Sequence, residues 1–361
     1  MIYYATKLVL CTLLLSGYTT ARDHYYSFYD SLTNVIFSLI FSVLMPIGQD
    51  FSHKLNIVNQ RFISVIYIYK SATSKISMKL SSLLLASFLI LFSSVSLSET
   101  FTFTAIPDED ESQLRTRFDK IANYLSEQLS VEVKYVPVKS YSAAITAFRN
   151  NQVQLAWFGG LSGVQARRLV PGSEAIAQGF EDQFFKSYLI AHYSVDIKRS
   201  KNFPTLDHYT FTFGSKGSTS GRLMPQFFIE KNAGKPIEQI FKRVGFSGDH
   251  SRTISQVEAG VYQIGAVNYK VWDSAVKKGK VDISKVKVIW ESPNYPDYQW
   301  TVRSGIDNTF GVGFKEKLTN ALINMKDKDL LASFPRKSFV PAKNSDYEPI
   351  ERVAKIIGLI D

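Results

Sequence analysis

After residue 98, apolar residues recur with the period of a strand and of a helix in turn. Residues 100–107 (TFTFTAIP) alternate as a strand does, whereas residues 111–129 carry an apolar stripe at helical spacing. The stripe consists of Leu114, Phe118, Ile121, Tyr124, Leu125 and Leu129. Further strands are expected at 131–138, 153–160, 174–180 and 187–194, with helices at 141–150 and 161–170. This βαβ order predicts an α/β fold with a largely parallel sheet and helices on both faces.

A second group of elements follows from about residue 205. We expect a strand at 209–213, a helix at 222–232, a loop-rich segment at 246–276, a strand at 286–292, and a helical tail at 314–325 and 347–360. A chain of 361 residues with 45% apolar content can bury a large core, and it is too long for one compact lobe. Two globular units are therefore predicted.

The net charge of +10 does not indicate a nucleic-acid partner once its distribution is considered. Residues 1–98 hold seven Lys or Arg and three Asp or Glu, so the remainder of the chain carries only +6. The basic runs KRSK (198–201) and KKGK (277–280) are typical of solvated turns. We expect no nucleic-acid partner.

The N-terminal segment indicates export. From Met78 the chain reads MKLSSLLLASFLILFSSVSLSETF, with a lysine, an apolar run and a small-x-small pattern before Glu99, which is typical of a secretory signal peptide at 78–98. Residues 1–77 are an uncertain leader, interpreted as an over-extended start; a membrane-anchored leader is the alternative. The sole cysteine, Cys11, leaves the remaining chain without a disulfide or thiol nucleophile. A periplasmic location is predicted.

The segment GSKGSTSG (214–221) follows a predicted strand and runs into a predicted helix. Backbone N–H groups at a helix start lack internal partners and lie at the positive end of the helix dipole, so they favour an anion. Ser218, Thr219 and Ser220 are able to cap the helix or donate a hydroxyl to the anion. The spacing does not fit G-x-x-x-x-G-K-[ST], which excludes a nucleotide-triphosphate loop. A serine-rich turn that only caps a helix remains the alternative.

Four segments, in this order, resemble the phosphate, phosphite and phosphonate group of substrate-binding proteins of ABC importers. They are residues 141–163, 214–228, 247–273 and 288–302. Within this group the chain is most similar to the branch labelled selenate-binding. The resemblance implies a two-lobed periplasmic binding protein of type II, with two crossover hinge strands and one tetrahedral oxyanion in the cleft. It places the lobes at 99–191 plus 297–361 and at 192–296, and it implies ABC permease and ATPase subunits as partners of a monomer.

The resemblance also implies the ligand-binding residues. Ser218, Thr219 and Ser220 match the hydroxyl-rich helix start, and His250 matches a histidine that reaches the anion from the same lobe. The opposing wall is implied to be Tyr141 and the loop of Trp157, Phe158, Gly159 and Gly160, acting through backbone N–H groups. Phe185 occupies a tyrosine position of relatives. Asn268 precedes Tyr269-Lys270 where binders of amino-substituted phosphonates carry a carboxylate, which disfavours an ammonium-bearing ligand.

No carboxylate belongs to this residue set, which favours a dianion without protons, such as selenate or sulfate, over phosphite or a phosphonate. Four carboxylates remain candidates for the cleft: Glu181, Asp182, Asp249 and Asp297. Tyr298 and Trp300 are interpreted as hinge packing. Three histidines in residues 99–361, with no HExxH pattern, predict no metal site, and neither a cofactor nor a catalytic residue is expected. A periplasmic sensor domain and an enzyme using His250 beside Ser218 or Ser251 remain alternatives.

Overall fold

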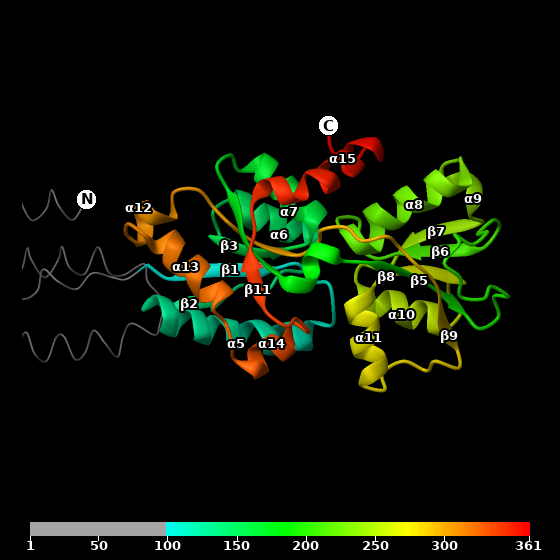
Figure 1. Ribbon diagram of the computed structural model, residues 1–361, viewed down its shortest axis with the longest axis horizontal. Helices are drawn as coiled ribbons and strands as arrows, with labels where there is room; N and C mark the ends of the chain where they lie inside the picture. Colours follow the sequence, from blue (N-terminus) through cyan, green and yellow to red (C-terminus); the bar gives the residue numbers. More distant parts are fainter. Residues whose placement is uncertain (1–98) are drawn as a thin grey trace, which may run out of the picture. The chain divides into compact units, whose positions relative to one another are not determined.

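The computed structural model describes residues 99–361, which lie within one compact unit (Figure 1). The predicted leader (1–77) and signal peptide (78–98) fall outside the described residues. The described part forms two lobes, each built on its own sheet, and the chain crosses between them twice. The predicted two-lobed α/β architecture is therefore confirmed.

The first lobe contains a six-stranded sheet of order β11-β4-β10-β3-β1-β2. Its strands are β1 (Phe101–Ala105), β2 (Val133–Tyr135), β3 (Leu155–Phe158), β4 (Glu174–Gly179), β10 (Gln299–Val302) and β11 (Phe339–Pro341). Its longer helices are α5 (Glu111–Leu129), α6 (Tyr141–Arg149), α7 (Gly160–Leu169), α13 (Phe314–Ile323) and α15 (Glu348–Ile356). Its short helices are η2 (Phe180–Phe184), α12 (Ile306–Phe310), α14 (Lys328–Ser333) and η4 (Asn344–Tyr347). In Figure 1, α5, α13 and α14 lie on one side of the sheet, and α6, α7 and α15 lie on the other.

The second lobe contains a five-stranded sheet of order β7-β6-β8-β5-β9. Its strands are β5 (Ser187–His192), β6 (Thr210–Phe213), β7 (Arg243–Phe246), β8 (Ile264–Asn268) and β9 (Val286–Glu291). Its helices are η3 (Thr219–Leu223), α8 (Met224–Ala233), α9 (Ile237–Ile240), α10 (His250–Glu258) and α11 (Tyr269–Lys277). Figure 1 shows α8 and α9 on one face of this sheet and α10 and α11 on the other.

Three details differ from the sequence-based expectations. Both sheets are mixed rather than largely parallel, because β5, β10 and β11 pair antiparallel with their neighbours. The strand that follows each crossing enters its sheet from the other lobe and therefore runs against its neighbours. The βαβ pattern of the sequence does not reveal this strand direction. The first crossing precedes β5 and so comes before Ser187, whereas the lobe boundary was expected after residue 191.

The third difference concerns residues 246–276, which were expected to be loop-rich. They hold α10, β8 and α11. Both helices have only nine residues, and each begins at a side-chain cap: Asp249 accepts the Arg252 N–H, and Asn268 accepts the N–H groups of Lys270 and Val271.

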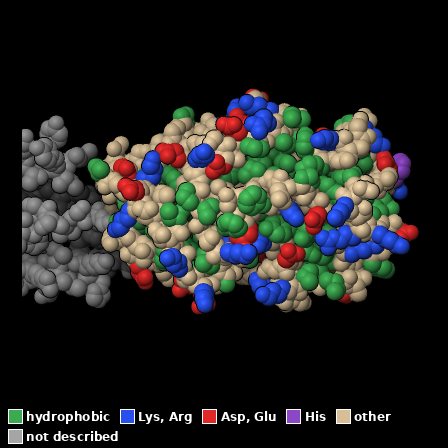
Figure 2. Space-filling model, viewed as in Figure 1, with side chains coloured by type: hydrophobic (Ala, Val, Ile, Leu, Met, Phe, Trp, Pro, Cys, Tyr) green, Lys and Arg blue, Asp and Glu red, His purple; other side chains and the backbone are tan. Residues whose placement is uncertain are grey.

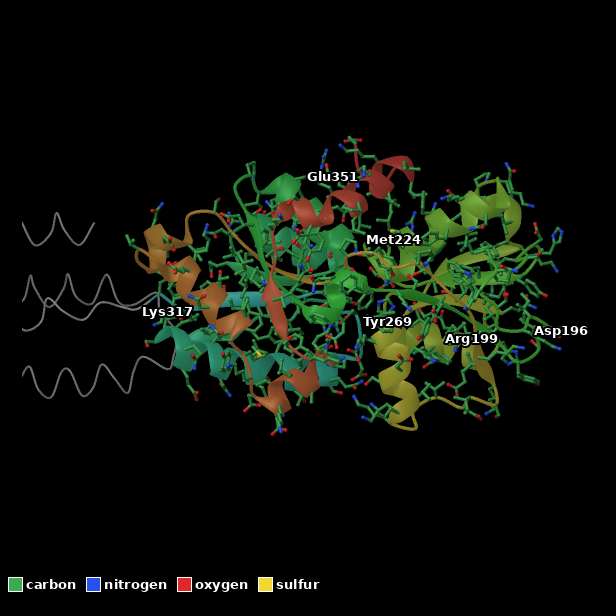
Figure 3. All side chains as sticks on the ribbon, in the orientation of Figure 1. Asp196, Arg199, Met224, Tyr269, Lys317 and Glu351 are labelled. Atoms are coloured by element: carbon green, nitrogen blue, oxygen red, sulfur yellow. The ribbon has the colours of Figure 1, made fainter. Side chains whose placement is uncertain are left out.

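An aromatic core fills the first lobe and extends to the contact with the second. Phe103, Phe118, Trp157 and Trp300 are buried and pack in tilted or edge-to-face pairs. Leu223 and Met224, from the start of the second lobe's α8, belong to the same cluster. Figure 3 labels Met224 and Tyr269 where the two lobes meet. The described conformation is therefore one in which the lobes pack against each other.

The two crossing segments lie side by side. Phe185 and Tyr295 exchange backbone hydrogen bonds of 2.9 and 3.0 Å, and the Asp297 N–H donates to the Asp182 carbonyl at 2.9 Å. The Asp182 carboxylate also forms a buried bidentate ion pair with Arg336, with distances of 2.7 and 2.9 Å. These contacts fix the backbone next to Asp297 and so position the residues described below.

Charged side chains of both signs are intermixed on the face shown in Figure 2. Within the KRSK run, Arg199 pairs with Glu291 at 3.0 Å. No helix among residues 99–361 combines the length and the apolarity needed to cross a bilayer.

Candidate ligand-binding site

The hydroxyl-rich helix start lies where the two lobes meet. Ser218, Thr219 and Ser220 are each at most 2% exposed. Ser218 caps the π-type turn η3, because its Oγ accepts the Gly221 N–H at 2.9 Å. A side chain at Gly221 has no room, since a Cβ there would lie 2.9 Å from Cε1 of His250. The glycine therefore lets the imidazole pack directly against the helix start.

His250 is the first residue of α10, and its ring is fully buried. The Asn268 backbone N–H donates to Nδ1 of His250 at 3.3 Å. Burial lowers the pKa of His250 to about 4, so the ring is neutral at pH 7. Because Nδ1 accepts, the single ring proton resides on Nε2, which has no hydrogen-bond partner. His250 thus presents one unused N–H donor.

Thr219 links the lobes through its hydroxyl. Its Oγ1 accepts the Leu161 N–H at 2.9 Å from the start of α7, and its hydroxyl donates to the Asp297 carboxyl. The other oxygen contact of Asp297 is the Gly160 N–H, which donates to Oδ1 at 2.9 Å. The backbone N–H groups of Gly160 and Leu161 are therefore already bonded within the protein.

Asp297 and Asp108 bring two carboxyl groups to the site, and both are at most 3% exposed. Burial raises the pKa of Asp297 to about 7 and that of Asp108 to about 6. Tyr298 donates its hydroxyl to Oδ2 of Asp108 at 2.8 Å. The other oxygen of each carboxyl, Oδ1 of Asp108 and Oδ2 of Asp297, has no partner.

Sequence reasoning missed Asp108 and the role of Tyr298, and it named Asp297 only as one of four candidates. Asp108 follows β1 just as the Gly-rich loop follows β6, and ligands of α/β sheets bind beyond the carboxyl ends of such strands. That position was the signal that could have identified it. Among the other three candidate carboxylates, Asp182 pairs with Arg336, Glu181 pairs with Lys270, and Asp249 caps α10.

The predicted wall residues differ in where they lie. Tyr141 is 2% exposed, its hydroxyl bonds Ser218, and a Cβ at Gly217 would lie 3.1 Å from its own Cβ. Trp157 stacks on Tyr298 with ring centroids 5.5 Å apart and planes at 24°. Trp157 and Tyr298, together with Asp108 and Asn268, line a cavity of about 10 Å³, which is too small for more than one water.

Three other predicted residues serve the surrounding structure. Phe158 is fully buried and packs edge-to-face on Phe148 in the first lobe. Phe185 lies in the first crossing segment, with its ring against Tyr269 and Tyr298. Gly159 precedes α7, and a Cβ there would lie 3.2 Å from Oδ1 of Asp297.

Asn268 has both ends of its side-chain amide engaged. Its Oδ1 accepts the N–H groups of Lys270 and Val271 at the start of α11, and its Nδ2 donates to the Tyr298 hydroxyl at 2.9 Å. Of this side chain, only the second N–H of Nδ2 is left for a ligand without breaking one of these bonds.

Unpartnered buried atoms concentrate in this region. Seven buried side-chain polar atoms among residues 99–361 lack a hydrogen-bond partner. Four of them belong to the site: Asp108 Oδ1, Ser220 Oγ, His250 Nε2 and Asp297 Oδ2. Each such atom costs about 1–3 kcal/mol unless it is bonded. Two of the four are donors and two are carboxyl oxygens, so the arrangement suits an anion that also carries a proton. Residues 99–361 contain no cluster of His, Cys, Asp and Glu suited to a metal ion.

Comparison with known proteins gives a consistent family. Residues 103–347 match the family described as the periplasmic substrate-binding protein of phosphonate ABC transporters. The chain is 40% identical over 265 residues to a probable phosphite-binding protein of an ABC transporter from Prochlorococcus marinus, covering 71% of this chain and 89% of that one. It is 23% identical to the phosphonates-binding periplasmic protein of Escherichia coli, covering 71% and 76% of the two chains.

A solved structure supports the fold. The Prochlorococcus marinus protein in complex with methylphosphonate superposes with a TM-score of 0.70 at 39% identity, covering 73% of this chain and all of that one. The chain has the type II periplasmic binding protein fold, as expected. The comparisons do not support the selenate-binding branch, and the two carboxyl groups at the site give a physical reason against it. The proteins of this family are binding components of transporters and not enzymes. The chain belongs to the family of periplasmic phosphonate-binding proteins of ABC transporters.

Proposed function

We propose that the protein captures phosphite or a small phosphonate, such as methylphosphonate, in a form that carries one proton on oxygen. The observation that carries this proposal is the set of four unpartnered atoms, which combines two donors with two carboxyl oxygens. Neutral His250 and the hydroxyl of Ser220 donate to the anion. The carboxyl groups of Asp108 and Asp297 accept its proton.

This chemistry separates the candidate anions. Sulfate and selenate carry no proton at neutral pH, so their oxygens only accept hydrogen bonds. The ionised forms of Asp108 and Asp297 repel such a dianion, so it binds only when both carboxyl groups keep their protons. A protonated phosphite or phosphonate donates its own proton to one carboxyl oxygen and leaves the remaining oxygens for the donors.

Capture is coupled to closure because the site is assembled from both lobes. Hydrogen bonds that cross between them include Leu161 N–H to Thr219, His250 N–H to the Asp108 carbonyl, and Asn268 to Tyr298. The helix start and His250 hold the anion in an open form, and bending at the crossings brings the carboxyl groups over it. We propose that the closed monomer delivers the ligand to an ABC permease driven by ATPase subunits.

A thermal-shift screen of the protein purified from the periplasm tests this function. Phosphite, methylphosphonate, phosphate, 2-aminoethylphosphonate, sulfate and selenate are compared after bound anions have been removed. A ligand at a hundred times its dissociation constant adds about 2.7 kcal/mol, which is several degrees for a chain of this size. The proposal requires the largest shift with phosphite or methylphosphonate. A larger shift with sulfate or selenate would contradict it.

Export is the second part of the proposal. A signal peptide that begins at Met78 and ends before Glu99 accounts for the sequence pattern there. Mass spectrometry of the periplasmic protein should find an N-terminus near Glu99. An N-terminus upstream of Met78 would refute this assignment.

A further inference from the structure

Four residues at the site, through backbone and side-chain groups, form a closed ring of hydrogen bonds that joins the two lobes. His250 donates its backbone N–H to the Asp108 carbonyl at 3.0 Å, and the Asn268 backbone N–H donates to His250 Nδ1 at 3.3 Å. The Asn268 side chain donates to Tyr298 at 2.9 Å, and Tyr298 donates to Asp108 Oδ2 at 2.8 Å. We call these four residues the interlobe ring. Asp108 and Tyr298 belong to the first lobe, whereas Asn268 and His250 belong to the second.

The direction of the two bonds through Tyr298 is determined by the helix start of α11. Asn268 Oδ1 accepts two backbone N–H groups there, so the NH₂ end of the amide must face Tyr298. The Tyr298 hydroxyl accepts that N–H, and its single proton is therefore available only for Asp108 Oδ2. This orientation follows from the hydrogen-bond network, which is the proper basis for assigning an amide.

The same logic fixes the two atoms of the ring that have no partner. Oδ2 of Asp108 is occupied as an acceptor, so any proton shared between this carboxyl and a ligand lies at Oδ1. Nδ1 of His250 is occupied as an acceptor, so the neutral ring donates from Nε2. Oδ1 and Nε2 are the two ring atoms left without a partner.

We propose that Asn268 and Tyr298 are positioning residues that set Asp108 Oδ1 as an acceptor and His250 Nε2 as a donor, so that the closed site selects an oxyanion carrying a proton. This inference rests on the proposed function and assigns the selectivity to two residues that need not touch the ligand. Because the ring spans both lobes, it is complete only when they are closed. Selection therefore operates at closure rather than at first contact.

The charged groups around the ring support this assignment. Glu109, Arg117 and Arg336 act on Asp108, and the buried Glu109 pairs with Arg117 at 2.7 Å. Burial exceeds the effect of the two arginines and raises the pKa of Asp108. Glu109 acts on His250, but burial dominates there as well and keeps the ring neutral at pH 7. The ring thus holds a neutral donor and a carboxyl group that readily shares a proton.

The test compares Tyr298→Phe with Tyr295→Phe. Both variants remove a buried hydroxyl from the second crossing segment, but Tyr295 bonds Ser187 and lies outside the ring. Affinities for methylphosphonate and sulfate are measured by calorimetry at pH 7, and thermal unfolding verifies that each variant is folded. Tyr298→Phe should reduce the ratio of the two affinities by about tenfold, the equivalent of one charge-assisted hydrogen bond. Tyr295→Phe should leave the ratio within about twofold.

Asn268→Asp provides a second variant, because aspartate also caps helices well but offers no N–H to Tyr298. It should reduce the selectivity ratio as Tyr298→Phe does. An unchanged ratio in both folded ring variants would overturn the proposal and leave the ring with a structural role only. If wild type binds neither phosphite nor methylphosphonate, or binds sulfate better, the proposed function itself has failed.

A direct observation on wild type does not depend on any variant. Long-range ¹H–¹⁵N NMR of the ¹⁵N-labelled protein distinguishes a protonated ring nitrogen from an unprotonated one. The spectrum should show that Nδ1 of His250 is unprotonated and that Nε2 is protonated at pH 7. A proton on Nδ1 would overturn the orientation of the ring whatever the affinities are.

Discussion

The two lobes bring opposite chemistry to the same site. The second lobe supplies donors, namely the hydroxyl of Ser220 and the Nε2–H of His250, whereas the first supplies the carboxyl groups of Asp108 and Asp297. The donor side alone would suit any tetrahedral anion. Under the proposed function, the carboxyl groups restrict the choice to an anion with a proton to donate. Under the proposed function, general affinity and selectivity are therefore separated between the lobes and combined by closure.

The largest effect is expected when the contacts of the crossing segments that position Asp297 are removed. Arg336→Met leaves the carboxylate of Asp182 buried without its ion-pair partner, so the free energy of unfolding should fall by about 3–5 kcal/mol. Arg168→Met is the matched control, because its pair with Glu351 is 40% and 33% exposed and should contribute at most about 1 kcal/mol. Urea unfolding of both variants measures the difference, and equal losses would refute the special role of the buried pair.

The donor side is tested by Ser220→Ala. The Ser220 hydroxyl has no partner within the protein, so its removal should weaken ligand binding by about 1–3 kcal/mol with little change in stability. Both methylphosphonate and sulfate should be affected, since each accepts from this donor. Calorimetry gives the affinities and thermal unfolding gives the stability. A loss of stability without a loss of affinity would mean that Ser220 serves packing only.

The acceptor side predicts a pH dependence. Burial raises the pKa of Asp297 to about 7 from 3.8, so the folded ligand-free protein holds a proton that the unfolded chain releases. The protonated carboxyl group of Asp297 contributes its full share to the free energy of unfolding below pH 3.8, and this contribution is lost as the pH rises to 7. The raised pKa of Asp108 also makes the folded state less stable as the pH rises, up to about pH 6. The pKa of His250, lowered to about 4, has the opposite effect on stability below pH 6.5 and so offsets the contribution of one of the two carboxyl groups there.

The variant Asp297→Asn removes the pH-dependent contribution of Asp297 to stability. Between pH 5 and pH 7.5, wild type without ligand should lose about 2–3 kcal/mol more stability than the variant does. Denaturant unfolding at several pH values provides the measurement. Parallel pH profiles for the two proteins would show that Asp297 is ionised in the folded state, contrary to this account.

The smallest effect is expected for an ion pair that joins the lobes outside the site. Lys270 and Glu181 lie 3.4 Å apart with side chains 20% and 14% exposed. Lys270→Gln should weaken ligand binding by less than about 1 kcal/mol, and added salt should reduce the difference. Lys315→Gln removes a pair within the first lobe and should leave the affinity unchanged. Identical affinities for Lys270→Gln and wild type at low salt would show that this ion pair does not contribute to closure of the lobes.

The sequence predicted the donor side better than the acceptor side for a physical reason. Glycines and hydroxyls at the start of a helix form a local pattern, so residues 218–220 stood out without any knowledge of the fold. Asp108 and Tyr298 are 190 residues apart in the chain, and only the two crossings bring them together. The absence of a carboxylate from the recognised residues therefore led to selenate, which the comparisons do not support.

Strand and helix patterns were read correctly for most of the first lobe, where α5 buries its apolar stripe as expected. The short helices α10 and α11 were missed, although their caps Asp249 and Asn268 are visible in the sequence as helix-start residues. The antiparallel pairings of β5 and β10 result from the crossings, which leave no periodic trace in the sequence.

The most direct test of the account is the ratio of the affinities for methylphosphonate and sulfate at pH 7, measured by calorimetry in wild type and in Asp297→Asn. Wild type should prefer methylphosphonate by about a hundredfold or more, the equivalent of one unsatisfied buried charge. The variant places a neutral amide at this position and should lower that ratio at least tenfold, mainly through tighter sulfate binding. A wild type that binds sulfate as tightly as methylphosphonate, or a ratio that does not change in the variant, would contradict the division between donor and acceptor lobes.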